Sequence, residues 1–514
     1  MFKRGLGFIL AMVLTVMPGC SHATVEPQTT DAEIVTTVPD TSNTVLHTED
    51  ETYIALSDNT ITVNGEILSG DSDSDVYGAN DIIYYESDKD ASYGEGTAAD
   101  AHTAEEAGEH VVVHITKPGT YRVSGKLPKG QIFVDLGDGA KKDPSAVVTL
   151  ILDNADITCT VAPAVFFYNV YECGVKDEAN ATAAVDTSAA GANVVIADDS
   201  TNTVNGAYVA RIYEPGTTDK LHKYDGAFYS RRSMNIFGGE KGNGILHIDA
   251  TNEGLDSEMH LTVNGGNITI TAQNDGINTN EDNISVTTIN GGSLTINAGL
   301  GEEGDGIDSN GYLVISGGTV ITSACDRGPD GGIDADCAIL INGGTLIALG
   351  NQNGAVSPDS KQNFIYTGLT GSVPKDSTIA LLSGEAVLAE TTAIKAGTSL
   401  VISVPGLEMG KAYTLKTANN TLTVYPAKME DNQFAPGGMQ RPGGNFQRPN
   451  DMQQGSPFAA VPEGLDEWLK SADIPEEIRT WIESMRDMAN SFGNRGDGMQ
   501  PPQGMQPDMP LPNA

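Results

Sequence analysis

The sequence has few basic side chains for its 514 residues: 29 Lys and Arg stand against 69 Asp and Glu, which leaves a formal net charge of −40. A chain this acidic repels nucleic acid, anionic membrane surfaces and other polyanions, unless cations lie between the two partners. The composition therefore argues against a nucleic-acid partner. It also makes cations part of any binding hypothesis.

Aromatic residues are scarce as well, at 6% of the chain, and both Trp residues, Trp468 and Trp481, lie near the C-terminus. Gly by contrast occurs 59 times, a composition that suits many short strands and tight turns better than helices. The absence of Trp before residue 468 excludes a tryptophan platform for sugar stacking in the rest of the chain.

Cysteine occurs only five times, without the Cys and His spacing that is typical of zinc sites. Four cysteines remain after Cys20. They either form two local disulfides or stay reduced or intermolecular, and the two sequence-adjacent pairs are Cys159 with Cys173 and Cys325 with Cys337.

The N-terminus predicts an export signal over residues 1–20, in which Lys3 and Arg4 precede an apolar run too short to span a membrane. Gly19 before Cys20 resembles the lipobox of bacterial lipoproteins, in which the cysteine is acylated. Met17 and Pro18 depart from that box, so simple secretion is the alternative. We expect an extracellular, cell-surface lipoprotein that a lipid on Cys20 anchors to a membrane, followed by a solvated Thr-rich and acidic linker over 21–50.

A repeat of 26 residues organises the centre of the chain, where Gly-Gly follows Asn264, Asn290, Ser316 and Asn342. Apolar residues alternate with Thr, Ser or Asn on both sides of each Gly-Gly, which is the period of a β-strand. A third apolar position, always preceded by Gly, recurs at Leu255, Ile277, Ile307 and Ile333. Three short strands per coil predict an all-β parallel β-helix, which we place over residues 51–360.

Residues 361–430 stay strand-like but lose the coil period, which predicts a β-rich C-terminal cap over the open end of the sheets. Residues 431–514 are rich in Gly, Pro, Met and Gln and cannot bury a core. A helical hairpin is expected near 464–491, where Asp473 would cap and Pro475 would begin the second helix. That hairpin either packs on the end of the solenoid or docks a partner.

Acidic residues recur at one corner of each predicted coil. Four successive turns read TNEG, QNDG, GLGEEGDG and CDRGPDGG, and each ends beside one of the inward apolar residues that follow Gly. Together they predict an oxygen-rich ridge along the solenoid. The residues expected to ligate metal there are Asp256, Asp275, Asn278, Glu302, Glu303, Asp305, Asp308, Asp330 and Asp334.

Stacked carboxylates on this ridge need a compensating charge. Equivalent residues of adjacent coils lie ~4.8 Å apart, and two carboxylates at that distance repel by roughly 3 kcal/mol at an effective dielectric constant of ~20. Ca²⁺ offers that charge, because its oxygen ligands lie ~2.3 to 2.6 Å from the ion, so two ligands span about one rung. The alternative is a solvated acidic face whose carboxylates point apart or accept hydrogen bonds from turn amides.

Several segments resemble one bacterial surface family, that of carbohydrate-binding domain-containing proteins. They are GTYRVSGKL, VVTLILDNADIT, DGAFYSRRSMNIFGG, the turns DGIN and DGID, and GKAYTLKT. The resemblance covers about residues 51–430 and implies a calcium-containing, right-handed parallel β-helix, similar in shape to polysaccharide lyases, that binds cell-wall polysaccharides such as cellulose or acidic polymers. The acidic turn positions of the family correspond here to Asp275, Asp305, Asp308 and Asp334, and the resemblance implies no catalytic residue. Residues 71–109 and 177–191 look like loops added to the pattern.

The sequence favours a binder over an enzyme. A lyase for acidic sugars needs a basic side chain beside its calcium, and no Lys or Arg lies between Lys241 and Arg327. A hydrolase needs two carboxylates at a set separation, which such an acidic sequence leaves open. Tyrosine rings or bridging calcium would then contact the sugar. The candidate side chains for sugar contacts are Tyr213, Tyr224, Tyr229 and Arg231.

These observations predict a surface-anchored, non-catalytic protein that binds polysaccharide in a calcium-dependent manner. We expect a monomer with a polysaccharide partner, and a membrane contact only through the lipid anchor. The alternatives are a calcium-dependent polysaccharide lyase or hydrolase and a protein-binding surface adhesin.

Overall fold

The computed structural model describes residues 51–426, apart from residue 59 and the segments 86–99, 175–176 and 214–219, and it leaves out the side chains of 210–213 and 220–222. The predicted signal peptide with Cys20, the linker over 21–50 and the tail over 431–514 lie outside the described residues. Strands dominate this part of the chain. Its helices are the short α1 (Ala104–Gly108), η1 (Ala140–Lys142) and η2 (Glu178–Asn180). None of the described helices is long and apolar enough to cross a membrane.

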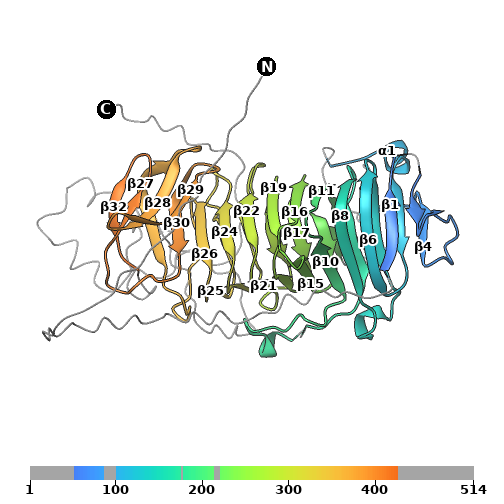
Figure 1. The fold of residues 1–514 in the computed structure, drawn as a ribbon, viewed down its shortest axis with the longest axis horizontal. Helices are drawn as coiled ribbons and strands as arrows, with labels where there is room; N and C mark the ends of the chain where they lie inside the picture. The colour runs from blue at the N-terminus through green and yellow to red at the C-terminus, as the bar shows by residue number, and fades with distance from the viewer. Residues whose placement is uncertain (1–50, 59, 86–99, 175–176, 214–219, 427–514) are drawn as a thin grey trace, which may run out of the picture. The chain divides into compact units, whose positions relative to one another are not determined.

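Parallel strands of successive repeats pair in three ladders, as the repeat predicts. The first ladder contains β10 (Ala192–Ile196), β15 (Met234–Gly238), β18 (Leu261–Val263), β21 (Val286–Ile289), β23 (Tyr312–Ile315) and β25 (Ala338–Ile341). The second contains β11 (Thr201–Gly206), β16 (Ile245–Ala250), β19 (Asn267–Ala272), β22 (Ser293–Asn297), β24 (Thr319–Ser323) and β26 (Thr345–Gly350). The long strand β8 (Val148–Thr158) pairs with both β10 and β11. Figure 1 shows β8, β11, β16, β19, β22, β24 and β26 side by side in chain order.

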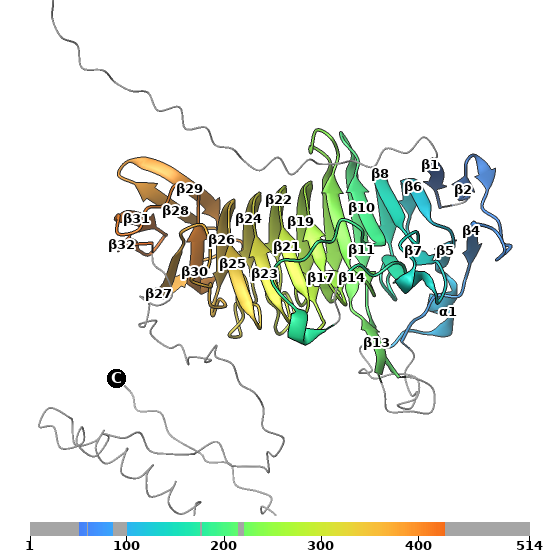
Figure 2. The same ribbon diagram turned by 90° about the horizontal axis from the view of Figure 1, so that it is seen from below.

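The third ladder carries the acidic corner. It contains β5 (Val111–Ile115), β7 (Gly130–Asp135), β9 (Val165–Asn169), β14 (Gly226–Ser230), β17 (Glu253–Ser257) and β20 (Ile277–Thr279). The ladder continues beyond its last strand through a parallel bridge between Ile277 and Ile307. The view turned by 90° in Figure 2 brings β5, β7, β14 and β17 into sight.

The 26-residue period is visible in the strand register. Leu261 pairs with Thr287, Thr287 with Leu313 and Leu313 with Ile339. The third ladder departs from this offset, since Leu255 pairs with Ile277 and Ile277 with Ile307. The turn before Ile307 is longer than the turn before Ile277, which gives the larger second offset, whereas the shorter first offset is shared by the second ladder, where Leu246 pairs with Ile268.

The glycine before each third-ladder residue is required by close packing. A Cβ at Gly276 would lie 2.2 Å from Cγ2 of Ile296 and 2.6 Å from the carbonyl oxygen of Gly306. A Cβ at Gly306 would lie 2.3 Å from the carbonyl oxygen of Gly332. Because such distances are far below van der Waals contact, only glycine lets this corner close against the second ladder. The inward residues Ile277 and Ile307 are consequently buried.

Strands of different pairing bound the coils at both ends. Near the N-terminus β1 (Glu51–Leu56) pairs in parallel with β6 (Gly119–Leu127), and β2 (Thr62–Val63) and β3 (Glu66–Ile67) form a hairpin, while β4 (Val76–Ala79) pairs antiparallel with β5. After β26 the pairing turns antiparallel. The strands there are β27 (Ile365–Val373), β28 (Thr378–Ser383), β29 (Ala386–Thr392), β30 (Gly397–Ser403), β31 (Tyr413–Lys416) and β32 (Thr421–Val424).

The four described cysteines are all free. The two local disulfides that the spacing offered as one alternative are therefore not formed. The Sγ atom of Cys325 instead lies 3.4 Å from the carbonyl oxygen of Glu302, and Sγ of Cys337 lies 3.7 Å from Oδ1 of Asn283.

Candidate metal centre and sugar-contacting surface

One row of side chains runs along the third ladder on its outer face. Phe133 pairs in register with Phe166, Phe166 with Tyr229, Tyr229 with Asp256 and Asp256 with Asn278. The amide of Asp308 donates to the carbonyl of Ile277 at 2.8 Å, and the amide of Asp334 donates to that of Ile307 at 2.8 Å, so both continue the row. The row is aromatic in its first half and acidic in its second.

Asp305, Asp308 and Asp334 form the tightest group in the acidic half. Each offers a carboxylate oxygen, and these three oxygens lie within 4.8 Å of one another. Two oxygens bound to one Ca²⁺ are separated by up to about 5 Å, because each lies ~2.3 to 2.6 Å from the ion. Three hard oxygen donors at this spacing therefore fit the ligand set that Ca²⁺ prefers. We call this group the aspartate triad.

Backbone amides of adjacent coils hold the neighbouring carboxylates in place. The amide of Asp305 donates to Oδ1 of Asp275 at 2.6 Å, and the amide of Gly331 donates to Oδ1 of Asp305 at 2.5 Å. Asp330 accepts a longer hydrogen bond, 3.4 Å, from the amide of Gly304. Its other oxygen, Oδ2, is buried without a hydrogen-bond partner. One oxygen of these carboxylates is thus tied to the turns, which limits the directions in which the other can point.

A second oxygen-rich group lies in the preceding coils, at Glu253, Asp256 and Asn278. The side-chain amide of Asn278 donates to Oε1 of Glu253 at 3.1 Å, and that of Asn280 donates to Oδ1 of Asp256 at 2.7 Å. Three further acceptors there are buried and have no hydrogen-bond partner: Oε2 of Glu253, Oδ2 of Asp256 and Oδ1 of Asn278. Buried polar atoms are normally satisfied, so these acceptors point to an additional cation or water.

The pKa values of the acidic row are raised. Burial raises the pKa of Asp305 to about 8 and that of Asp308 to about 6, and neighbouring carboxylates add to both shifts. Burial likewise raises the pKa of Glu253 to about 8, and it raises those of Asp256 and Asp275 well above their usual range. Without a counter-ion Asp305 and Glu253 therefore keep their protons at neutral pH, and a cation would displace them.

We predict that the metal-free protein becomes less stable as the pH rises from 6 to 8.5. The folded state keeps protons on Asp305 and Asp308 that the unfolded chain has already released, so stability is present below these raised pKa values and is lost as the pH rises through them. Scanning calorimetry of chelator-treated protein should show a melting temperature several degrees lower at pH 8.5. The pH slope should be smaller in Asp305→Asn than in the matched control Asp326→Asn, an exposed position. Equal slopes in the two variants would contradict the prediction.

The structure separates two of the predicted metal ligands from the others. Glu302 and Glu303 are exposed at the middle of their turn, whereas Asp305 at its end is half-buried beside Asp308 and Asp334. The eight-residue turn is long enough to project its centre into solvent. Among the described residues, only Asp305, Asp308 and Asp334 bring three such ligand atoms within 4.8 Å of one another.

Sequence reasoning missed a lysine in this region. Lys223, in β13 (Lys220–Tyr224), lies upstream of the acidic coils in sequence, and its Nζ pairs with Oδ2 of Asp225 at 2.9 Å. Burial lowers the pKa of Lys223, but Asp225, Glu253 and Asp256 outweigh that effect and leave it raised. A lysine held charged in this way is poorly suited to act as a base. The Asp-Gly dipeptide at 225–226 matches the later acidic turns, and it could have indicated that Lys223 lies beside the acidic coils.

The side chains predicted to contact sugar differ in how far they are buried. The rings of Tyr224 and Tyr229 are buried against Phe166, at centroid distances of 4.8 and 5.1 Å, so neither presents a face to a sugar. That expectation fails because both rings pack into the aromatic half of the row. The side chain of Tyr213 lies outside the described residues. Arg231 is half-buried, with its guanidinium 4.4 Å from the ring centroid of Tyr168.

The ring beside Arg231, that of Tyr168, is half-buried, and neither it nor its half-buried neighbour Phe133 was singled out in the sequence. Tyr168 stacks on Phe133 at a centroid distance of 5.4 Å and an interplanar angle of 29°. Aromatic residues at alternate positions of a strand are also typical of a core, so the local sequence carried no signal that these rings reach the surface.

The family model described as carbohydrate-binding domain-containing protein matches residues 109–425. A curated protein of that description from Acetivibrio thermocellus is 32% identical over 161 residues, which are 31% of this chain and 45% of that protein, so the match spans less than half of this relative. A solved structure of the polysaccharide lyase-like protein from C. thermocellum, a gadolinium derivative, is similar with a TM-score of 0.36 and 23% identity, over 60% of this chain and 90% of that one.

Proposed function

The chain belongs to the family of carbohydrate-binding domain-containing proteins, and on that premise we propose that it binds polysaccharide without cleaving it and that binding depends on Ca²⁺. The observation that carries the calcium part is the aspartate triad, whose three oxygens lie within 4.8 Å of one another. Asp305, Asp308 and Asp334 would hold the ion. The buried, unpartnered acceptors of Glu253, Asp256 and Asn278 offer a second position in the same row.

A bound Ca²⁺ would supply positive charge and open coordination positions for oxygen atoms of a glycan. The chain's own residues do the rest: the amides of Asp305 and Gly331 orient the carboxylates, and the coil backbone keeps them at the spacing of one rung. On a protein with a net charge of −40, an acidic polymer approaches only where cations neutralise the surface. The row therefore favours anionic glycans over neutral ones.

The aromatic half of the row supports a second type of contact. Phe133 and Tyr168 are half-buried and stacked, and Arg231 lies over the ring of Tyr168. Ring faces suit the apolar C–H faces of pyranoses, and an arginine donates hydrogen bonds to hydroxyl or carboxylate oxygens. We infer that a glycan chain lying along the third ladder contacts first these three residues and then Ca²⁺ bound in the acidic half of the row.

The proposal extends to fold and location. The three parallel ladders support a right-handed parallel β-helix as the winding of the coils. Cys20 would carry the lipid that anchors a monomeric protein at the cell surface. The ion pair of Lys223 with Asp225 favours binding over lyase chemistry, because it keeps a lysine beside the acidic row protonated.

Affinity electrophoresis tests the function directly. The full chain should migrate more slowly through gels that contain polygalacturonate than through plain gels when Ca²⁺ is present, and a chelator should markedly reduce the difference. Asp305→Asn should weaken the apparent affinity about 10-fold, because the triad loses one charged ligand. The control Asp326→Asn removes the same charge from an exposed position and should behave like wild type. Equal retardation with and without Ca²⁺ would overturn the proposal. So would the absence of any retardation by polygalacturonate, xylan and cellulose derivatives.

A further inference from the structure

A cavity of about 290 Å³ lies where the antiparallel C-terminal strands meet the coils. Its lining comes from Asn297 at the end of β22, from Leu300 in the acidic turn, and from two loop segments, 375–376 before β28 and 392–395 after β29. Backbone hydrogen bonds of 2.8 Å join these segments, from Asp376 N to Ala393 O and from Ala393 N to Ser377 O. Backbone hydrogen bonds therefore hold the two loop segments of the lining together.

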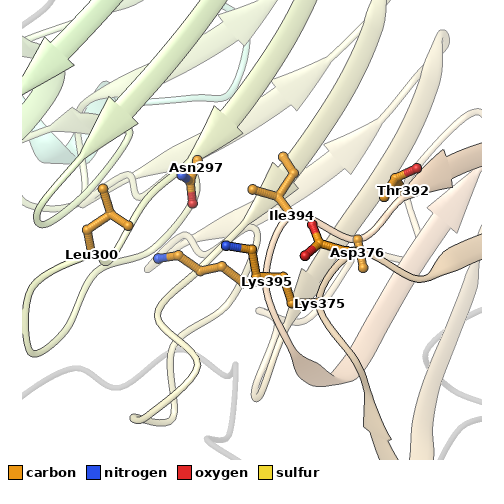
Figure 3. Close-up of a pocket in the computed structure, with 8 residues that line it drawn as sticks. Asn297, Leu300, Lys375, Asp376, Thr392, Ile394 and Lys395 are labelled. Carbon is orange, nitrogen blue, oxygen red and sulfur yellow. The ribbon is translucent and has the colours of Figure 1, made fainter.

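Two lysines project into this space. Figure 3 shows the amines of Lys375 and Lys395 pointing in the same direction, toward Asn297 and Leu300. Lys395 is 8% exposed and donates to the carbonyl oxygen of Ala298. Within the described part of the chain, neither amine forms an ion pair with a carboxylate. A buried ammonium is ordinarily paired, so the buried amine of Lys395, with the exposed Lys375 in the same cavity lining, points to an anionic ligand.

The rest of the lining matches a sugar. Oδ1 of Asn297 is buried without a hydrogen-bond partner and can accept a hydroxyl proton, and the Asp376 carboxylate can accept another. Leu300 and Ile394 supply apolar surface for C–H groups. A volume of about 290 Å³ is near the lower end of the roughly 300 to 1,000 Å³ that is typical of small-ligand sites. That size suits a single sugar unit better than an extended chain.

We propose that this cavity is a binding site for one uronate unit of an acidic polysaccharide. Lys375 and Lys395 bind the carboxylate, and Asn297 and Asp376 accept hydrogen bonds from hydroxyl groups. The proposal rests on the polysaccharide-binding function above and adds the chemical class of the ligand. It also assigns a site at the opposite end of the acidic turn from Asp305. Acidic sugars would then have a second binding place besides the acidic row.

The test is calorimetric titration of the full chain with trigalacturonate in the presence of a chelator. Wild type should bind it, and Lys375→Glu should bind roughly 10-fold more weakly or worse, because a charge-assisted hydrogen bond becomes a repulsion. Lys375 is exposed, so the variant should fold. The matched control Lys416→Glu makes the same charge change at an exposed position of β31 and should bind like wild type.

The failure of this site and that of the calcium-dependent function are distinguishable. Equal affinity of Lys375→Glu and wild type, no binding of trigalacturonate by wild type, or equal binding of a neutral trisaccharide would overturn the cavity proposal. Equal binding of acetate alone would overturn its sugar component. Calcium-dependent retardation that survives in Lys375→Glu, with trigalacturonate binding lost, is the result expected if both proposals hold.

Discussion

Replacing Asp308 with asparagine is expected to weaken the tightest calcium binding of the protein about 100-fold, since affinity at oxygen sites depends steeply on the number of charged ligands. Asp308 lies at the centre of the triad in chain order, and it is half-buried on the rung between Asn278 and Asp334. Asparagine keeps the shape and one oxygen but removes the charge. Titration of Ca²⁺ into chelator-treated protein measures the change.

The control for this variant is Glu302→Gln. It removes the same charge from the exposed centre of the same turn and should leave calcium affinity unchanged. If both variants lose affinity equally, the ions respond to net charge alone, and the acidic row is a solvated face without a defined site. An unchanged affinity in Asp308→Asn would remove Asp308 from the ligand set.

The largest effect on stability is expected from Gly306→Ala. A Cβ at this position would lie 2.3 Å from the carbonyl oxygen of Gly332 and 2.8 Å from Cβ of Thr322. The hydroxyl of Thr322 also donates to that carbonyl at 2.6 Å, so neither neighbour is free to move away. We expect the free energy of unfolding to fall by about 3 kcal/mol or more, as for severe overpacking of a rigid core. Urea denaturation followed by circular dichroism measures it.

Gly139→Ala is the matched control, because no atom lies within 4 Å of its added Cβ and its φ is not in the left-handed region. It should unfold at the same urea concentration as wild type. A similar midpoint for Gly306→Ala would show that the coils relax around the added methyl group. Calcium binding should weaken along with the fold in Gly306→Ala, since Gly306 lies between Asp305 and Asp308.

Much of the coil architecture could be predicted, because a parallel coil repeats its own pattern. The Gly-Gly period places Leu261, Thr287, Leu313 and Ile339 in register, as the strand pairing confirms. Inward residues need only be apolar and glycine turns need only be short, so the local sequence is enough to reveal both. The cap was less predictable in detail, since its antiparallel pairing of β26 with β30 joins distant segments.

The site was only partly predictable. The acidic positions could be found from the sequence because they recur at one place in the repeat, and Asp305, Asp308 and Asp334 do lie together. Glu302 and Glu303 share the same turn but not the same surroundings, because turn length decides which side chain bends back toward the ladder. The tyrosine candidates failed for the opposite reason: Tyr229 alternates like a surface residue, yet its ring is buried against the rings of Phe166 and Tyr224.

The sequence by itself determined the period of the coils, the glycine corners and the row of acidic side chains, because each depends on a short pattern that recurs in every repeat. Only the tertiary structure decided which acids come within reach of one ion, that Lys223 reaches the acidic row from an earlier coil, and that Lys375 and Lys395 meet Asn297 in one cavity. These juxtapositions join segments far apart in the chain. Their distances depend on turn lengths and on how the last strands close over the coils, and no local pattern encodes either.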